Sequence, residues 1–322
     1  MADNKMKNKG ISFYFFEDVF SNYNWEKEPE SSYELLLETR ARQLRDSYSY
    51  IRLWYSSGSD SETVLQTFLK HNIHIDEIMV ATSPFKEADA ELIKRAIPKL
   101  KLLENQLHKT KITILKTTAD QFLDILENQD YDKIATDFTL RSVSYLSASY
   151  YIHPELCEKP HLTNNKVVNL IGHTKPRLEK RDNKFFAYEY DTGISQVSMT
   201  PNLEFFYTTP NFPELHIKQL HLVKNYIKFK YPDLENTSLS ENSDYRYDIE
   251  KACRVSIDNT FTFSKEGTLR GLQPKAKLAV QEAFTSYPSL YYALKTITKD
   301  HRYILKNWKF MGVKSKEYYL GT

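Results

Sequence analysis

The chain has 322 residues, of which 41% are hydrophobic and 27% are charged, and its formal net charge is +2. This composition is normal for a globular protein of one large or two ordinary domains. No apolar stretch approaches the roughly 20 residues of a membrane span, the apolar patch at 11–16 is too short for a signal peptide, and two cysteines do not make a disulfide framework. We therefore expect a cytoplasmic protein.

Residues 1–45 are expected to form an N-terminal extension, with a strand at 11–16 and an amphipathic helix over 32–45. Ser32 is a good N-cap for this helix, and Glu34 follows near the positive end of the helix dipole. The helix leads directly into the next predicted strand, at 50–55.

The segment 50–65 is the most informative part of the chain. An apolar strand at 50–55 breaks into small polar residues, and a helix then follows over 60–71. The loop between them reads Ser56-Ser57-Gly58-Ser59-Asp60-Ser61. Exposed N–H groups in a loop with so little side-chain bulk, together with the positive end of the helix dipole, form a concave anion site. Neither a Walker loop nor a Gly-x-Gly-x-x-Gly sequence is present.

The loop at 56–61 resembles the Ser-Gly-Gly-x-Asp-Ser signature of the PP-loop ATP pyrophosphatases. The resemblance implies that Ser56, Ser57, Gly58, Ser59 and Ser61 grip the pyrophosphate of ATP while the α phosphate is attacked. It also makes Asp60 the candidate Mg²⁺ ligand and a catalytic residue, because Mg²⁺ is usually held by one or two carboxylates plus phosphate oxygens.

Ser57 departs from that signature, since the family usually has Gly there. Either the loop tolerates a Cβ at this point or its grip on the phosphates is loosened. The whole chain looks similar to uncharacterised phage-encoded PP-loop proteins. Its abundant Lys, Asn, Tyr and Phe are what AT-rich coding gives, as in many phage genomes.

Beyond the loop, predicted strands and helices alternate. The strands are expected at 76–82, 111–116, 132–136 and 166–171, and the helices at 86–107, 119–128 and 138–150. Repeated β-α units of this length favour a parallel sheet with helices on both faces. We therefore expect an α/β domain over 46–200, HUP- or Rossmann-like by the resemblance, that binds ligands at the carboxyl ends of its strands.

Further candidate residues follow the strands of this sheet. After the second strand, the resemblance implies backbone contacts from Ala81, Thr82 and Ser83 to adenine or ribose. After the strand at 132–136, Asp137 either caps a helix or lies near the nucleotide, with Arg141 on the same side.

A basic turn follows the strand at 166–171. It contains Gly172, Lys175 and Arg177. A cation at this edge would stabilise the negative charge that develops on the phosphoryl oxygens and the leaving pyrophosphate, so Lys175 and Arg177 are candidate catalytic residues. The alternative is an exposed basic turn stiffened by Pro176.

The remaining part, 201–322, is expected to form a mainly helical domain, with helices near 212–230, 244–255, 274–286 and 288–306. His216 and His221 lie five positions apart on that helix, about 140° around its axis, so they do not share one metal. Residues 265–322 hold 11 Lys and Arg against 4 Asp and Glu. This basic tail is either a solvated helical face or a surface for a polyanion such as RNA.

These patterns predict an enzyme that cleaves ATP, with Mg²⁺, to AMP and pyrophosphate. It would adenylate a carboxylate, amide or ureido oxygen for attack by an amine, as an asparagine synthetase does. Two alternatives stay open: an RNA-modifying enzyme of the thiolation type, in which Cys157 and Cys253 move sulfur, and a nucleotide-binding module without turnover. The acceptor, a partner protein and homo-oligomer formation are not decided by the sequence.

Overall fold

The computed structural model describes residues 15–81, 95–115, 167–172, 177–189, 203–239 and 314–322, together with residues 245 and 252. Within them lies a five-stranded sheet whose strands all run parallel, in the order β3-β2-β1-β4-β7. These strands are β1 (Tyr50–Trp54), β2 (Glu77–Ala81), β3 (Lys111–Leu115), β4 (Val167–Ile171) and β7 (Leu203–Phe205). The predicted α/β class with a parallel sheet is therefore confirmed.

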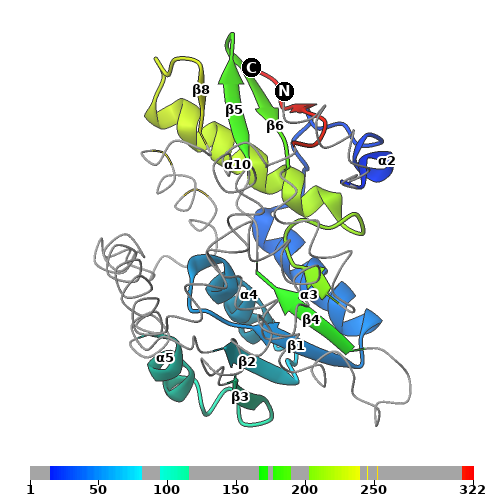
Figure 1. Cartoon of the computed structure of the whole chain (residues 1–322), viewed down its shortest axis with the longest axis vertical. Helices are drawn as coiled ribbons and strands as arrows, with labels where there is room; N and C mark the ends of the chain where they lie inside the picture. Colours follow the sequence, from blue (N-terminus) through cyan, green and yellow to red (C-terminus); the bar gives the residue numbers. More distant parts are fainter. Residues whose placement is uncertain are drawn as a thin grey trace, which may run out of the picture.

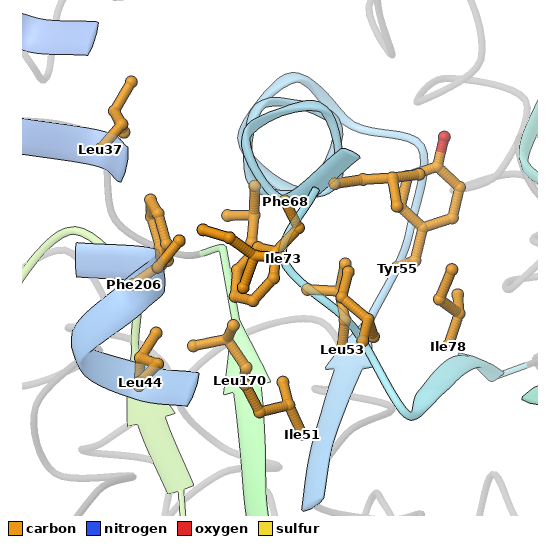
Figure 2. Packing of buried hydrophobic residues seen from close by; sticks show 14 of the residues in the cluster. Leu37, Leu44, Ile51, Leu53, Tyr55, Phe68, Ile73, Ile78, Leu170 and Phe206 are labelled. Carbon is orange, nitrogen blue, oxygen red and sulfur yellow. The ribbon is translucent and has the colours of Figure 1, made fainter. Parts of the chain in front are cut away.

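Helices α3 (Tyr33–Ser47) and α4 (Ser59–Lys70) pack on one face of this sheet, in the lower half of Figure 1. The Ser32 hydroxyl caps α3 by accepting a hydrogen bond from the Leu35 N–H at 3.1 Å, as the sequence predicts. Figure 2 shows the resulting core: Leu37 and Leu44 of α3, Phe68 of α4 and Phe206 meet Ile51, Leu53 and Leu170 of the strands. A shorter helix, α5 (Ile97–Leu102), adds Leu100 to the same core.

The opposite face of the sheet is buried too, but its centre is polar. Arg52 and Glu77, each 1% exposed, form an ion pair at 2.8 Å. The Asn169 Oδ1 atom accepts hydrogen bonds from the Arg52 guanidinium and the Trp54 indole, both at 3.1 Å. Burial by itself would raise the pKa of Glu77, but hydrogen bonds from Thr113 and Arg52 outweigh it and lower the pKa to about 2. This carboxylate therefore stays ionised inside the sheet.

A second, antiparallel sheet lies in the upper half of Figure 1 and packs on the long helix α10 (Pro213–Lys230). Its strands, in spatial order, are β8 (Thr237–Ser238), β5 (Leu178–Arg181), β6 (Lys184–Ala187) and β9 (Tyr318–Tyr319). Trp25, which follows the short helix α2 (Glu17–Phe20), stacks on Tyr318 with ring centroids 4.2 Å apart. Both ends of the described chain therefore join this layer.

The strand pairings cross the domain boundaries expected from the sequence. β7 lies after residue 200 and yet joins the parallel sheet, whereas β5 and β6 lie before it and belong to the second sheet. The expected extension at 1–45 also contributes α3 to the core of the parallel sheet.

Helix 212–230 is found as α10, whereas the helices expected at 119–128, 138–150, 274–286 and 288–306 and the strand at 132–136 lie outside the described residues. In the described part, no helix is long and apolar enough to cross a bilayer.

Arg40 links α3 to the end of β7 through buried polar contacts. Its side chain is 2% exposed, lies 2.8 Å from a Glu204 carboxylate oxygen, and donates to the carbonyls of Phe205 and Phe206. Removing one partner of a buried pair typically costs about 3–5 kcal/mol, so Arg40→Ala should lower the free energy of unfolding by about 3 kcal/mol in urea. The control is Arg42→Ala on the same helix, whose side chain is exposed and pairs with the half-buried Glu38; such a surface pair is worth less than about 1 kcal/mol. Equal losses in the two variants would contradict this assignment.

Candidate functional site

The loop at 56–58 leaves the parallel sheet at the point where the strand order reverses. From β1, the chain proceeds through β2 and β3 on one side, whereas β4 and β7 are added on the other. In open parallel sheets the crevice beyond the carboxyl ends of the strands at such a point is where ligands bind. The loop then enters α4, a helix of 12 residues that begins at Ser59, so that the first N–H groups of the helix, which have no acceptor within it, lie at the same edge.

Ser57 adopts a left-handed backbone conformation, with φ of 60°. Residues with a Cβ rarely adopt this conformation, whereas Gly does so at no steric cost. At the position where the sequence departs from the signature, the backbone therefore has the geometry that favours Gly, although this chain carries Ser there. The loop tolerates the Cβ by accepting local strain.

Hydroxyl groups hold the loop in shape. The Ser61 Oγ atom donates to the Gly58 carbonyl at 3.1 Å and lies 3.2 Å from the Ser56 Oγ atom. The Gly58 N–H in turn donates to Ser56 Oγ at 3.3 Å. Ser56 and Ser61 therefore brace the turn. The Ser57 hydroxyl differs: it is buried, the residue being 8% exposed, and it has no hydrogen-bond partner among the described residues.

Two carboxylates lie in the first turn of α4, and their surroundings differ. Glu62 is 6% exposed; it accepts a hydrogen bond from the Tyr55 hydroxyl at 2.5 Å and lies 3.3 Å from the Lys99 ammonium. Asp60 is only half-buried. The carboxylate of Glu62 is thus compensated by Tyr55 and Lys99, and Asp60 is the less buried of the two carboxylates.

Gly172, directly after β4, fixes how closely the sheet approaches this helix. A Cβ at Gly172 would lie 2.8 Å from the Asp60 carbonyl oxygen and 2.9 Å from the Ser61 Cα. On the same side, the Tyr207 hydroxyl donates to the Asp60 carbonyl at 2.9 Å. Sequence reasoning treated Gly172 only as the start of a basic turn and missed Tyr207. A Gly immediately after a buried strand was the available signal for the first, and there was none for the second.

The other predicted site residues are distributed as follows. Ala81 is the last residue of β2, at the carboxyl edge of the sheet, as predicted. Arg177 is half-buried at the base of the β5–β6 hairpin, where its carbonyl accepts from the Tyr188 N–H at 3.2 Å. Thr82, Ser83, Asp137, Arg141, Lys175, Cys157 and Cys253 lie outside the described residues.

The chain matches no protein-family model, and no curated protein is similar to it in sequence. Among the described residues, no three His, Cys, Asp or Glu side chains are grouped as they would be to hold a metal by themselves.

The first prediction for the site concerns Gly172. Because its missing Cβ would meet backbone atoms that cannot swing aside, Gly172→Ala should push α4 from the sheet and cost about 1–3 kcal/mol of stability. Gly58→Ala is the matched control, since the added Cβ would meet only the Ser56 hydroxyl at 3.1 Å. Thermal unfolding of both variants measures the difference. A Gly172 variant as stable as the wild type would refute the close approach.

The second prediction concerns Ser57. Ser57→Gly should raise the free energy of unfolding by about 1 kcal/mol, because it removes left-handed strain and an unpartnered buried hydroxyl. Ser47→Gly, in the last turn of α3, should instead lose about 0.5 kcal/mol through the poor helix propensity of Gly. Urea denaturation compares the two variants, and opposite signs are expected. The same sign in both would show that Ser57 is not strained.

Proposed function

We propose that this protein binds ATP with Mg²⁺ at residues 56–61 and cleaves it to AMP and pyrophosphate to activate an acceptor oxygen. The observation that carries the proposal is the left-handed residue of a loop of small residues at the strand-order reversal, close before the start of a 12-residue helix. Backbone N–H groups and the helix dipole at such a position favour a polyphosphate.

The resemblance to PP-loop ATP pyrophosphatases and the geometry of the loop support each other. The signature has Gly at the position of Ser57, and Ser57 has the backbone conformation of a Gly. The buried Ser57 hydroxyl, without a described partner, is a donor suited to a phosphoryl oxygen, since a buried hydroxyl gains from any partner that satisfies it.

Asp60 is the residue that we assign to Mg²⁺. A triphosphate placed against the first turn of α4 would meet the charge of Asp60, and a divalent cation shared by the carboxylate and the phosphate oxygens turns that repulsion into a contact. Asp60 stands at the Asp position of the signature and is less buried than Glu62, which favours it over Glu62 as the ligand.

In the proposed reaction a carboxylate, amide or ureido oxygen attacks the α phosphorus, and the bond to the pyrophosphate breaks. An amine then attacks the activated carbon, and AMP leaves. Lys175 and Arg177 remain the candidates for stabilising the charge that develops on the phosphoryl oxygens and the leaving group. Ala81, Thr82, Ser83, Asp137 and Arg141 keep their proposed places around the adenosine. Asparagine-synthetase-like ligation is the preferred subtype.

The alternatives lead to different observations. An RNA-modifying enzyme of the thiolation type would bind RNA through the basic tail at 265–322, with an affinity that falls steeply with salt, and would need Cys157 and Cys253. A non-catalytic module would bind ATP without forming AMP.

The test uses the purified full-length protein with ATP, Mg²⁺ and the small-molecule fraction of a bacterial extract, and measures AMP and pyrophosphate. Both products are expected in equal amounts. Asp60→Asn should reduce their formation by about 100-fold or more, because a bound metal stabilises transition-state charge by several kcal/mol. The control is Asp46→Asn, an exposed carboxylate on α3, which should act as the wild type. ADP and phosphate as products, or full activity in Asp60→Asn, would overturn the proposal.

A further inference from the structure

A buried chain of polar side chains lies beside the proposed nucleotide loop. The His216 Nε2 atom, on α10, lies 2.7 Å from the Glu189 Oε1 atom, and the His216 Nδ1 atom lies 3.4 Å from the Thr208 hydroxyl. The three residues are 1%, 4% and 4% exposed, respectively. They come from three segments: the first turns of α10, the end of the β5–β6 hairpin, and the loop after β7.

The chain reaches the carboxyl edge of the parallel sheet through Thr208. β7 pairs with β4, and the Phe206 N–H extends that pairing by donating to the Ile171 carbonyl at 3.0 Å. The next residue, Tyr207, donates to the Asp60 carbonyl at 2.9 Å, and Thr208 follows it. The hydroxyl at the end of the polar chain therefore belongs to the same short loop that contacts the first turn of α4.

Glu189 is held at the other end. Its N–H donates to the Ser315 hydroxyl and its carbonyl accepts from the Ser315 N–H, both at 2.9 Å. The Trp25 ring lies edge-on to the imidazole, with centroids 5.9 Å apart. The Oε1 atom makes no aligned hydrogen bond with a described residue, so its 2.7 Å contact is off the direction of the ring N–H. Contacts of this kind often align only when substrate is bound.

A hydroxyl, an imidazole and a carboxylate in this order are the components of a proton-transfer chain. We propose that Thr208, His216 and Glu189 take up the proton that the amine loses as it attacks the adenylated acceptor. This inference rests on the proposed function and names the base for its second step.

In that step the amine nitrogen forms a bond to the activated carbon, and the bond from that carbon to the AMP oxygen breaks. The amine proton passes to the Thr208 oxygen while the Thr208 proton passes to His216 Nδ1, and Glu189 holds the resulting imidazolium. Thr208 is the residue that touches substrate, whereas His216 and Glu189 act through it as positioning residues.

The first readout is the protonation state of His216, which requires no turnover. A histidine that acts as a base toward Thr208 must carry its proton on Nε2 and none on Nδ1. Nitrogen chemical shifts of the protein labelled in its 9 histidines report this directly, with His216 assigned from the signal lost in His216→Gln or shifted in Thr208→Val. Protons on both nitrogens, or on Nδ1 alone, would overturn the proposal in favour of a fixed structural contact.

The second readout separates the two steps of the reaction, in the same mixture of ATP, Mg²⁺ and bacterial small molecules. Thr208→Val should still release one equivalent of pyrophosphate in a burst, whereas steady AMP formation should fall by about 100-fold. Thr208→Ser should restore it. The control is Thr67→Val, because Thr67 is also buried and its hydroxyl donates within α4, to the Thr63 carbonyl.

Each outcome decides the matter. Loss of the burst together with turnover in Thr208→Val, or turnover equal to that of Thr67→Val, would show that Thr208 is not part of a proton path. If the wild type forms neither pyrophosphate nor AMP, the proposed function itself is wrong. The proton path through Thr208, His216 and Glu189 then has no reaction in which to act.

Discussion

The contact between the backbone after β4 and the first turn of α4 is the constraint on which the candidate site depends. Gly172 lies so close to Asp60 and Ser61 that no side chain fits between them. This approach sets the start of α4 against the carboxyl edge of the sheet, and the Tyr207 hydroxyl secures it from the β7 side. The loop at 56–58 must then turn within a few residues, which accounts for the left-handed backbone of Ser57.

Buried polar groups, rather than apolar packing alone, hold the surrounding elements in place. Arg40 joins α3 to the end of β7, and Arg52 joins β1 to β2 and β4 through Glu77 and Asn169. Buried ion pairs add little net stability compared with apolar residues of the same volume. Because a shift in register would leave these charges unpaired, we infer that they fix the register of the central strands, and with it the position of the loop.

The sequence predicts the parallel sheet well, because each of its first strands is an apolar run followed by a helix or a turn. It does not reveal β7, which is only three residues long and lies between prolines. It also missed the β5–β6 hairpin, whose first strand, Leu178–Arg181, is rich in charge. The turn of that hairpin at Asp182 and Asn183, both with positive φ, was the signal that could have shown it, since two-residue hairpin turns favour Asn and Asp.

The candidate site divides in the same way. The loop at 56–61 is local, so that its motif and its position before a helix could be recognised from neighbouring residues. Gly172, Tyr207 and the Thr208–His216–Glu189 chain lie more than 100 residues away from the loop, and only the pairing of β4 with β1 and of β7 with β4 brings them to it. Contacts created by strand order are not visible in the spacing of residues along the chain.

Nucleotide binding at residues 56–61 is tested most directly by titrating the nitrogen-labelled protein with Mg·ATP and following its backbone amide signals. The largest shifts should fall on residues 56–61 and on Gly172, and inorganic pyrophosphate should perturb the loop amides in the same direction. Shifts centred on other parts of the chain, with the amides of 56–61 unchanged at saturation, would contradict binding at this loop.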